Sequence, residues 1–206
     1  MKLIVAAVLC GGRGTRLQPV IGSLPKCLAP VGGRPFLSYV LDQIAGQGVM
    51  KTVLCVRVGA TAVLKAFPQE HEGMELDYSW EPSPLGTGGA LKNALPLLDS
   101  DPVLVLNGDT YCRFDLDALL MSHQQSDVAV TMICSNWAPM KPSGVYLLSQ
   151  RFLNTLPEGP SSLEELVAAQ PSNRVWRYFT ASEFLDIGTP ETYGGAEAWM
   201  AARGML

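Results

Sequence analysis

The sequence is poor in the residues that mark a metal cluster or a disulfide framework. It contains two histidines, His71 and His123, which lie far apart and form no metal-binding motif. Its five cysteines are odd in number, scattered, and nowhere arranged as Cys-x-x-Cys. This pattern argues against a disulfide-rich secreted protein and predicts reduced thiols in a cytoplasmic one.

The sequence also lacks a basic excess and a long hydrophobic run. Its 15 lysines and arginines stand against 19 acidic residues, a formal net charge of −4, whereas nucleic-acid-binding surfaces usually carry a positive excess. The first apolar run, residues 3–10, is too short to cross a membrane and shows no signal-peptide cleavage pattern. We therefore expect neither nucleic acid nor a membrane as a partner.

The chain does have enough apolar sequence to build a core. Hydrophobic residues make up 48% of its 206 residues, which predicts one folded domain over 1–206. The run VLVL at 103–106 is apolar at every position, as in strands that are covered on both faces. Because such runs alternate with helix-like segments, we expect a three-layer α/β fold with a mostly parallel central sheet.

The alternation is regular up to about residue 134 and looser beyond it. Strands are expected at 3–9, 52–58, 76–80, 103–106 and 128–133, and helices at 37–47, 61–67, 88–98 and 116–125. Further on we expect a strand in GVYLLS, a helix in SLEELVAAQ capped by Ser162, and a strand near 175–179. A last helix after DIGTPETY carries Trp199 and Met200, which are expected to be exposed and so allow a homodimer contact.

The first expected strand ends in CGGRGTR, at the edge where open parallel sheets bind their ligands. Gly11, Gly12 and Gly14 remove side chains, so that backbone N–H groups can approach a ligand closely. Arg13 and Arg16 add positive charge. The stretch suits a polyphosphate, although it is neither a Walker A loop nor G-x-G-x-x-G. Taken alone, it is equally compatible with a tight turn that carries two solvated arginines.

Further charged residues are candidates for the same site. Lys26 lies between Pro25 and Cys27, where the proline restricts the backbone and the ammonium group can stabilise charge on a phosphoryl group. Asp109 in LNGDT and Asp186 in FLDIGTP each follow an apolar run. A carboxylate there needs a partner, and Mg²⁺ is commonly held by one or two carboxylates plus substrate phosphates. Taken singly, Lys26 is better explained as an ordinary surface lysine, and each aspartate as a turn-forming or helix-capping residue.

The motifs GGRGTRL with LPKCLAPVGGRPFL, EPSPLGTGGAL, LNGDT and FLDIGTPETY together span nearly the whole chain. Their combination resembles the sugar-1-phosphate nucleotidyltransferase family, and LCGGRGTRL, LNGDTY and LEELVAAQ are most similar to D-glycero-D-manno-heptose 1-phosphate guanylyltransferases. The resemblance implies a Rossmann-like nucleotidyltransferase fold, with residues 1–134 binding the nucleotide and 135–206 forming a reduced sugar-binding part and C-terminal helix. It also implies Mg²⁺-dependent attack of a sugar 1-phosphate on the α-phosphate of a nucleoside triphosphate, which releases pyrophosphate and a nucleotide-sugar.

The resemblance also implies residue roles at the positions that match the family's motifs. The catalytic residues would be Arg16, which holds the leaving β- and γ-phosphates, Lys26, which neutralises the reacting phosphoryl oxygens, and Asp109. Asp109 and Asp186 would bind the metal. The implied nucleotide-binding residues are Leu9, Gly11, Gly12, Gly14, Thr15, Glu81, Gly86, Thr87 and Gly88. The implied sugar-binding residues are Asn107, Gly108, Lys141 and Gly144.

Glu81 bears on the choice of base. It precedes Pro82, at a position where many thymidylyl- and uridylyltransferases of the family have glutamine. A carboxylate can accept hydrogen bonds from the neighbouring N1–H and N2–H₂ groups of guanine. Glu81 therefore favours GTP, and the product would be GDP-D-glycero-α-D-manno-heptose for a surface polysaccharide. The alternative is a loop glutamate that faces solvent.

The chain departs from the family between Ile133 and Gly144. Relatives have further strands here, with a Glu-Lys pair and an N-x-G-x-Y segment, whereas this chain has CSNWAPMKPSGVYLL. Lys141 would stand in for the family lysine without a preceding glutamate, and only Gly144 and Tyr146 fit the second segment. Either the acceptor site is genuinely reduced, or a flexible lid is missing from the sequence given.

Three functions are compatible with these observations. The first is an active guanylyltransferase, the second a related enzyme that uses another hexose 1-phosphate or another base, and the third a non-catalytic homologue that binds nucleotide-sugar and regulates a partner. The intact Arg16, Lys26, Asp109 and Asp186 favour an enzyme. The shortened acceptor region favours the regulatory homologue.

Overall fold

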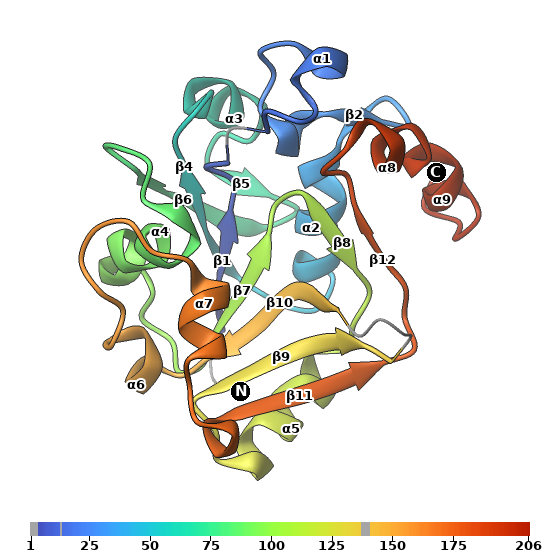
Figure 1. Ribbon diagram of the computed structural model, residues 1–206. Coiled ribbons are helices and arrows are strands. Elements are labelled where there is room, and N and C mark those ends of the chain that lie inside the picture. The colour runs from blue at the N-terminus through green and yellow to red at the C-terminus, as the bar shows by residue number, and fades with distance from the viewer. Residues whose placement is uncertain (1–3, 13, 137–140) are drawn as a thin grey trace.

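The computed structural model describes residues 4–12, 14–136 and 141–206. Eight strands form one sheet in the order β11-β9-β10-β7-β1-β4-β6-β5 (Figure 1). Their bounds are β1 Val5–Leu9, β4 Lys51–Val56, β5 Glu70–His71, β6 Met74–Trp80, β7 Val103–Asn107, β9 Val130–Ser135, β10 Pro142–Leu148 and β11 Val175–Thr180. Two short pairs lie outside this sheet: β2 Pro30–Val31 with β3 Arg34–Pro35, and β8 Thr110–Cys112 with β12 Phe184–Asp186.

Parallel pairing dominates the large sheet. Strand β1 pairs in parallel with β4 and β7, β4 with β6, and β11 with β9. Strand β10 runs antiparallel between β7 and β9, and β5 runs antiparallel to β6. Because β1, β4, β6 and β7 point the same way, their carboxyl ends meet at one edge. The expected mostly parallel central sheet is confirmed.

Helices cover both faces of this sheet. Helices α2 (Phe36–Ala45), α3 (Ala60–Ala66), α5 (Leu116–Ser126) and α9 (Ala196–Ala201) pack on one face, and α4 (Gly86–Ala94), α6 (Gln150–Leu153) and α7 (Leu163–Ala168) pack on the other. The remaining helical segments are α1 Gln18–Ile21, α8 Pro190–Gly194 and the 3₁₀ turns η1 Lys26–Leu28, η2 Leu95–Leu97 and η3 Ser172–Arg174. The three-layer arrangement is therefore as the sequence predicts.

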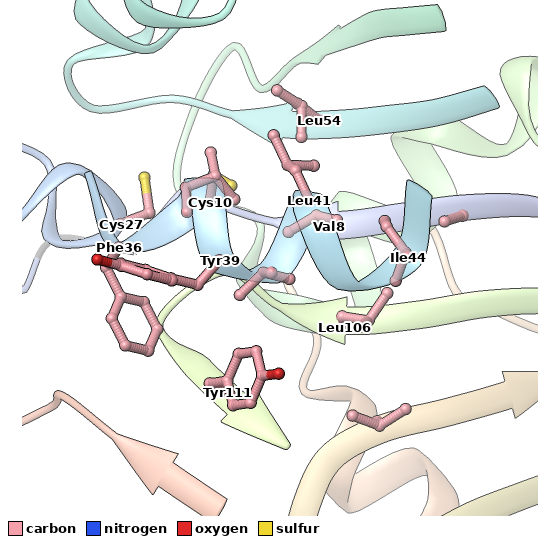
Figure 2. Packing of buried hydrophobic residues seen from close by; sticks show 14 of the residues in the cluster. Val8, Cys10, Cys27, Phe36, Tyr39, Leu41, Ile44, Leu54, Leu106 and Tyr111 are labelled. Carbon is pink, nitrogen blue, oxygen red and sulfur yellow. The ribbon is translucent and has the colours of Figure 1, made fainter. Parts of the chain in front are cut away.

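Strand β1 is apolar at every position because it supplies side chains to two cores. In β1, Val8 belongs to the core under α2, whereas Ala7 belongs to the core under α4. Figure 2 shows the first core, in which Phe36 and Leu41 of α2 are fully buried close to β1 and β7. Burying one such side chain contributes roughly 1.5–3 kcal/mol, so packing on both faces holds the strand ends in place.

Most expected elements are confirmed, with shifted ends that have local causes. The helix expected at 88–98 begins earlier, at Gly86, and changes at Leu95 into a 3₁₀ turn that contains a proline, which cannot donate a helical hydrogen bond. Ser162 caps α7 as expected, because its hydroxyl accepts from the backbone N–H of Glu165 at 3.2 Å. The last helical region starts at Pro190, inside the TPETY stretch rather than after it, where Thr189 forms a capping box.

The expectation that Trp199 and Met200 are exposed is wrong. Met200 is completely buried in the core under α2. The Trp199 ring is partly buried and lies edge-on to the Tyr111 ring, with their centroids 6.2 Å apart, while the Arg203 guanidinium lies 3.8 Å above it. The C-terminal helix thus completes the core of its own chain, and Met200 is not available for a contact with a second copy.

Two further expectations concern cysteines and membrane spans. All five cysteines are free and buried, so the scattered thiols form no disulfide, as their spacing predicts. Across 4–12, 14–136 and 141–206, no helix combines the length and the apolar character needed to cross a membrane.

A first prediction concerns the cap of α5. The Oδ1 atom of Asp115 accepts a hydrogen bond from the Ala118 N–H at 3.0 Å, while Asp117 stands in the first turn. Replacing Asp115 by alanine should cost about 1 kcal/mol and lower Tm by about 2–4 °C. The control Asp117→Ala loses only a favourable dipole interaction of about 0.3 kcal/mol. Equal Tm losses for the two variants in thermal unfolding would contradict the assigned cap.

Candidate active site

Two adjoining cavities lie at the carboxyl ends of the parallel strands. The first has a volume of about 260 Å³ and the second about 340 Å³. They share Leu9, Gly12 and Asp109, so they form one continuous depression. This is the edge at which open α/β sheets bind ligands. Of the residues singled out from the sequence, the first cavity contains Gly14, Thr15, Arg16 and Lys26, and the second contains Gly11, Glu81, Gly86, Thr87 and Asn107.

The first cavity is lined by the glycine-rich turn after β1. Gly14 has a φ of +59°, and a Cβ atom there would lie 3.2 Å from Cβ of Lys26. A side chain at Gly14 would therefore strain the backbone and crowd the lysine. In the described ranges Arg16 makes no ion pair with a carboxylate, which leaves its charge available to an anion. Arg13 lies outside the described residues.

The charged centre of the first cavity is Lys26. Its Nζ atom lies 2.6 Å from Oδ2 of Asp109 and 3.3 Å from Oδ1 of Asp186. The lysine side chain is 12% exposed, whereas those of the two aspartates are 31% and 55% exposed. A nearly buried ammonium group needs such partners, and the aspartates remain open on the solvent side.

The pair β8–β12 brings the two aspartates together. Residue Asp186 of β12 lies opposite Thr110 of β8, directly after Asp109. The backbone N–H of Ile187 donates to the carbonyl of Asp109 at 3.1 Å, and the Gly188 N–H donates to Oδ1 of Asp186 at 2.7 Å. Both strands have three residues, which is too short for a periodic sequence signal. The sequence therefore did not reveal this pairing.

The residues at this centre fit a divalent cation that is shared with a phosphate ligand. Two carboxylates face one ammonium group, so the cluster retains net negative charge, and its oxygen donors are the type that Mg²⁺ prefers. Within the described part of the chain, no group of three or more His, Cys, Asp or Glu side chains could hold a metal. A cation between Asp109 and Asp186 would need substrate oxygens or water to complete its shell.

Glu81 occupies the second cavity and is almost fully buried. Its side chain is 5% exposed, and its Oε2 atom accepts from the Leu85 N–H at 3.3 Å. A Cβ atom at Gly11 would lie 2.1 Å from Oε1 of Glu81. Gly11 therefore makes room for the carboxylate, so a solvent-facing loop glutamate is the wrong description.

Arg57 is a site residue that the sequence reasoning missed. Its Nη2 atom donates to the Gly11 carbonyl at 3.1 Å, and its Nε atom lies 3.9 Å from Oε2 of Glu81. Burial raises the pKa of the Glu81 carboxyl, while the Leu85 N–H and the Arg57 charge oppose that rise. The available signal was the position of Arg57, directly after a parallel strand at the ligand-binding edge.

Two buried thiols line the first cavity beside the lysine. Cys10 and Cys27 are 6% and 3% exposed. A hydrogen bond to Cys27 and burial both raise the pKa of Cys10. The Cys10 thiol therefore stays neutral and adds no negative charge to a cavity that is otherwise suited to phosphates.

The glycines at the start of α4 lie against the segment of the chain that contains Ser161. A Cβ atom at Gly86, where φ is +69°, would lie 2.4 Å from the Ser161 carbonyl oxygen, and one at Gly88 would lie 2.6 Å from the Ser161 hydroxyl. The Thr87 hydroxyl donates to Glu164 at 2.8 Å. Gly86 and Thr87 still line the second cavity, but the space beside Gly88 is filled by Ser161.

The expected sugar-binding residues are brought together only in part. Asn107 lines the second cavity, and Gly144, with a φ of +77°, lies against it, since a Cβ atom there would be 2.6 Å from the Asn107 amide nitrogen. Gly108 packs on β1, where its N–H donates to the Leu9 carbonyl at 3.0 Å. Lys141 is exposed, and its backbone pairs with Ser135. The structure does not place Lys141 in the lining of either cavity.

The glycine turn, the Lys26 centre and the three-layer sheet are together typical of α/β proteins that bind nucleotides at the carboxyl ends of their strands. The profile of the nucleotidyl transferase family matches residues 5–161, and the chain belongs to this family. The family resemblance and the Rossmann-like fold expected from the motifs are thereby confirmed.

Curated relatives of this chain include guanylyltransferases. A D-glycero-alpha-D-manno-heptose 1-phosphate guanylyltransferase of Campylobacter jejuni is 37% identical over 125 residues, which cover 61% of this chain and 56% of the relative. A mannose-1-phosphate guanylyltransferase of Mycobacterium tuberculosis is 28% identical over a match 222 positions long. This match covers 91% of this chain and 62% of the relative. The chain thus spans less than two thirds of the length of these relatives.

Solved structures support the fold over its whole extent. The crystal structure of HddC from Yersinia pseudotuberculosis complexed with GMP-PN matches with a TM-score of 0.84 and 26% identity, over 97% of this chain and 100% of that chain. A putative glucose-1-phosphate thymidylyltransferase from Bacillus anthracis matches with a TM-score of 0.83 at 15% identity, over 95% of this chain and 94% of that chain. At that identity the second likeness concerns the fold alone.

A second prediction follows from the burial of Glu81. A carboxyl whose pKa is raised on folding binds more protons in the native state, so its ionisation lowers stability as pH rises above the ordinary glutamate range. Replacing Glu81 by glutamine removes that ionisation. We expect a higher Tm than wild type at pH 8, with a difference that shrinks as the pH falls from the raised pKa of the folded state toward the ordinary glutamate value.

The matched control is Glu75→Gln, on the same strand at an exposed position. This variant should show no pH-dependent gain. If thermal unfolding at pH 8 shows Glu81→Gln to be less stable than wild type, ionisation of the buried carboxylate does not destabilise the folded state.

Proposed function

We propose that this protein transfers GMP from GTP to a sugar 1-phosphate, D-glycero-α-D-manno-heptose 1-phosphate, and releases pyrophosphate and GDP-sugar. The observation that carries the proposal is the convergence of Lys26, Asp109 and Asp186 beside a glycine-rich turn, next to a cavity whose polar wall is Glu81. The names of the Campylobacter jejuni relative and of the Yersinia pseudotuberculosis structure support the same reaction.

The triphosphate would occupy the first cavity. There Gly12, Gly14 and Thr15 would surround it with backbone N–H groups, with Gly11 at the adjoining second cavity, while Arg16 would hold the β- and γ-phosphates that leave. The sugar phosphate oxygen attacks the α-phosphorus, and the bond to the β-phosphate oxygen breaks. No proton has to be removed, because the attacking phosphate is already an anion, so catalysis rests on positioning and charge stabilisation.

Lys26 would bind the reacting phosphoryl oxygens. Its ammonium group is held by Asp109 and Asp186, so it is positioned before substrate arrives and needs little reorganisation. Mg²⁺ bound by the same aspartates would neutralise phosphate charge. The carboxylates of Asp109 and Asp186 would repel the negative phosphates. The positive charges of Lys26 and Mg²⁺ would offset that repulsion.

The base would lie in the second cavity, where Glu81 accepts hydrogen bonds from guanine N1–H and N2–H₂. Arg57 would support this contact, since it helps keep Glu81 ionised and holds the Gly11 carbonyl. The proposed contact requires an ionised Glu81, because only the ionised carboxylate accepts hydrogen bonds from both guanine donors. Leu9, Gly86 and Thr87 would complete the walls of this cavity.

The acceptor would enter from the side of Asn107, Gly108 and Gly144. Of these, Gly144 belongs to the part 135–206 for which the family resemblance implies sugar binding. Lys141 remains a proposed sugar contact only if the acceptor extends beyond the described cavities. A hexose 1-phosphate is the second candidate, since the Mycobacterium tuberculosis relative is named for mannose 1-phosphate. We further propose a cytoplasmic location on the basis of the five free thiols. A homodimer is also proposed, with an interface that does not include the buried Met200.

A third prediction tests the reaction. We would measure pyrophosphate release with Mg²⁺, each of four nucleoside triphosphates, and a panel of sugar 1-phosphates. GTP with heptose 1-phosphate should give the highest kcat/KM. Turnover with UTP but not GTP would contradict the role of Glu81, and GTP binding without any turnover would favour a regulatory homologue.

The aspartate assignment is tested in the same assay with Asp109→Asn. Removing this carboxylate charge from the proposed metal site should lower kcat at least 100-fold, the effect that mutagenesis gives for one electrostatic stabiliser. The protein should stay folded, because the amide oxygen can still accept from Lys26. Asp117→Asn, an exposed acid of α5, is the control. Near-normal rates for Asp109→Asn would exclude the assignment.

A further inference from the structure

Residues 159–164, which we call the clasp, lead into α7 and lie against the start of α4 (Figure 1). Two backbone hydrogen bonds join the clasp to this helix. The Ser161 N–H donates to the Leu85 carbonyl at 2.8 Å, and the Ser161 carbonyl accepts from the Gly88 N–H at 2.9 Å. The clasp therefore pairs with the backbone on both sides of residues 86 and 87. No residue of the clasp takes part in the reaction proposed above.

Side chains reinforce this backbone contact. The Thr87 hydroxyl donates to Oε2 of Glu164 at 2.8 Å and accepts from the Leu163 N–H at 2.8 Å. The Ser162 hydroxyl donates to the same Oε2 atom at 2.9 Å. One oxygen of the Glu164 carboxylate therefore receives two hydroxyl donors, and hydrogen bonds to a charged acceptor are stronger than those between neutral groups.

The start of α4 needs this support, because its own sequence disfavours a helix there. Three of its first four residues are glycines, and glycine is among the residues least favourable to a helix. Leu85, at the N-cap, makes no capping hydrogen bond with its side chain. The glycines also let the clasp approach, since a Cβ atom at Gly89 would lie 2.4 Å from the Gly159 carbonyl oxygen. The clasp thus replaces the cap that the sequence of α4 lacks.

The residues that the clasp supports form a wall of the second cavity. Gly86 and Thr87 line that cavity. Leu85, directly before them, donates its N–H to Oε2 of Glu81 at 3.3 Å, while its carbonyl is held by the clasp. A shift of the clasp would therefore move the Leu85 N–H, and with it the Glu81 carboxylate that is proposed to bind the base.

Glu164 lies behind this wall. It contacts Thr87 but does not line the second cavity. The residue is exposed, so its substitution opens no gap in the core. An effect of Glu164 on a base in the second cavity would therefore pass through Thr87 and the start of α4.

We infer that Glu164 is a positioning residue for recognition of the base. Through Thr87 it fixes the start of α4, and thereby the Leu85 N–H that orients the Glu81 carboxylate. The inference rests on the proposed function and deepens it, since it concerns selectivity for guanine. It also gives a residue of α7, outside the part of the chain expected to bind the nucleotide, a role at the nucleotide.

The test compares GTP with inosine triphosphate, whose base keeps N1–H but lacks the N2 amino group. A correctly oriented Glu81 carboxylate should favour GTP, because it accepts from both guanine donors. For Glu164→Ala we expect the Kd for GTP in the presence of Mg²⁺ to rise about 3- to 10-fold, the loss typical of one hydrogen bond. The Kd for inosine triphosphate should rise less, so the preference for GTP should fall. Calorimetry measures both constants without requiring turnover.

Glu164→Gln is the conservative variant, because its amide oxygen can still accept from Thr87. It should retain more of the preference for GTP than Glu164→Ala does. The matched control is Glu165→Ala, which removes the same charge from the first turn of α7. The Glu165 side chain is exposed and makes no hydrogen bond or ion pair with another described residue. This variant should keep the wild-type Kd for both nucleotides.

Two results would overturn the inference while the proposed function stands. In the first, Glu164→Ala keeps the wild-type preference for GTP, whatever its Tm, and Glu164 then has a structural role alone. In the second, Glu165→Ala loses as much of the preference as Glu164→Ala does, and the effect then comes from the charge of the helix. If wild type binds GTP no more tightly than inosine triphosphate, the base assignment of the proposed function fails and the inference fails with it.

Discussion

The interaction on which the rest of the site depends is the contact of one ammonium group with two carboxylates. Lys26 belongs to a 3₁₀ turn, Asp109 follows β7, and Asp186 ends β12. A lysine that is 12% exposed would be costly without partners, so the three segments hold one another through charge. The same pairing leaves one negative charge in excess, and that excess makes the centre suitable for a cation that arrives with phosphates.

The glycines around this centre serve two different purposes. Those of the first turn keep the cavity open, and Gly11 in addition makes space for the Glu81 carboxylate. Gly88, in contrast, allows the segment that contains Ser161 to close on α4, so its missing side chain is replaced by protein rather than by ligand. A glycine-rich motif in the sequence looks the same in both cases. Only the contact that a Cβ atom would make separates them.

Glu81 illustrates how a buried charged group reduces stability. Its side chain is 5% exposed, and burial raises the pKa of its carboxyl. Arg57 offsets part of that cost by lying near the carboxylate. The proposed contact with a guanine base would offset more of it, because the base would complete the hydrogen bonds of the carboxylate.

Local sequence determined the layers and most of the site. Apolar runs such as 103–106 predict strands buried on both faces. Gly14 and Asp109 follow strand ends where ligands bind, and Lys26 belongs to the next motif along the chain, so motif order was sufficient to place them. Tertiary structure alone decided the rest. Asp186 reaches Lys26 through two strands of three residues, which carry no periodicity. Arg57 became a partner of Glu81 because parallel strands end side by side, and Met200 became core because the last helix folds back. Each of these contacts joins residues distant in sequence, whose proximity only the folded sheet creates.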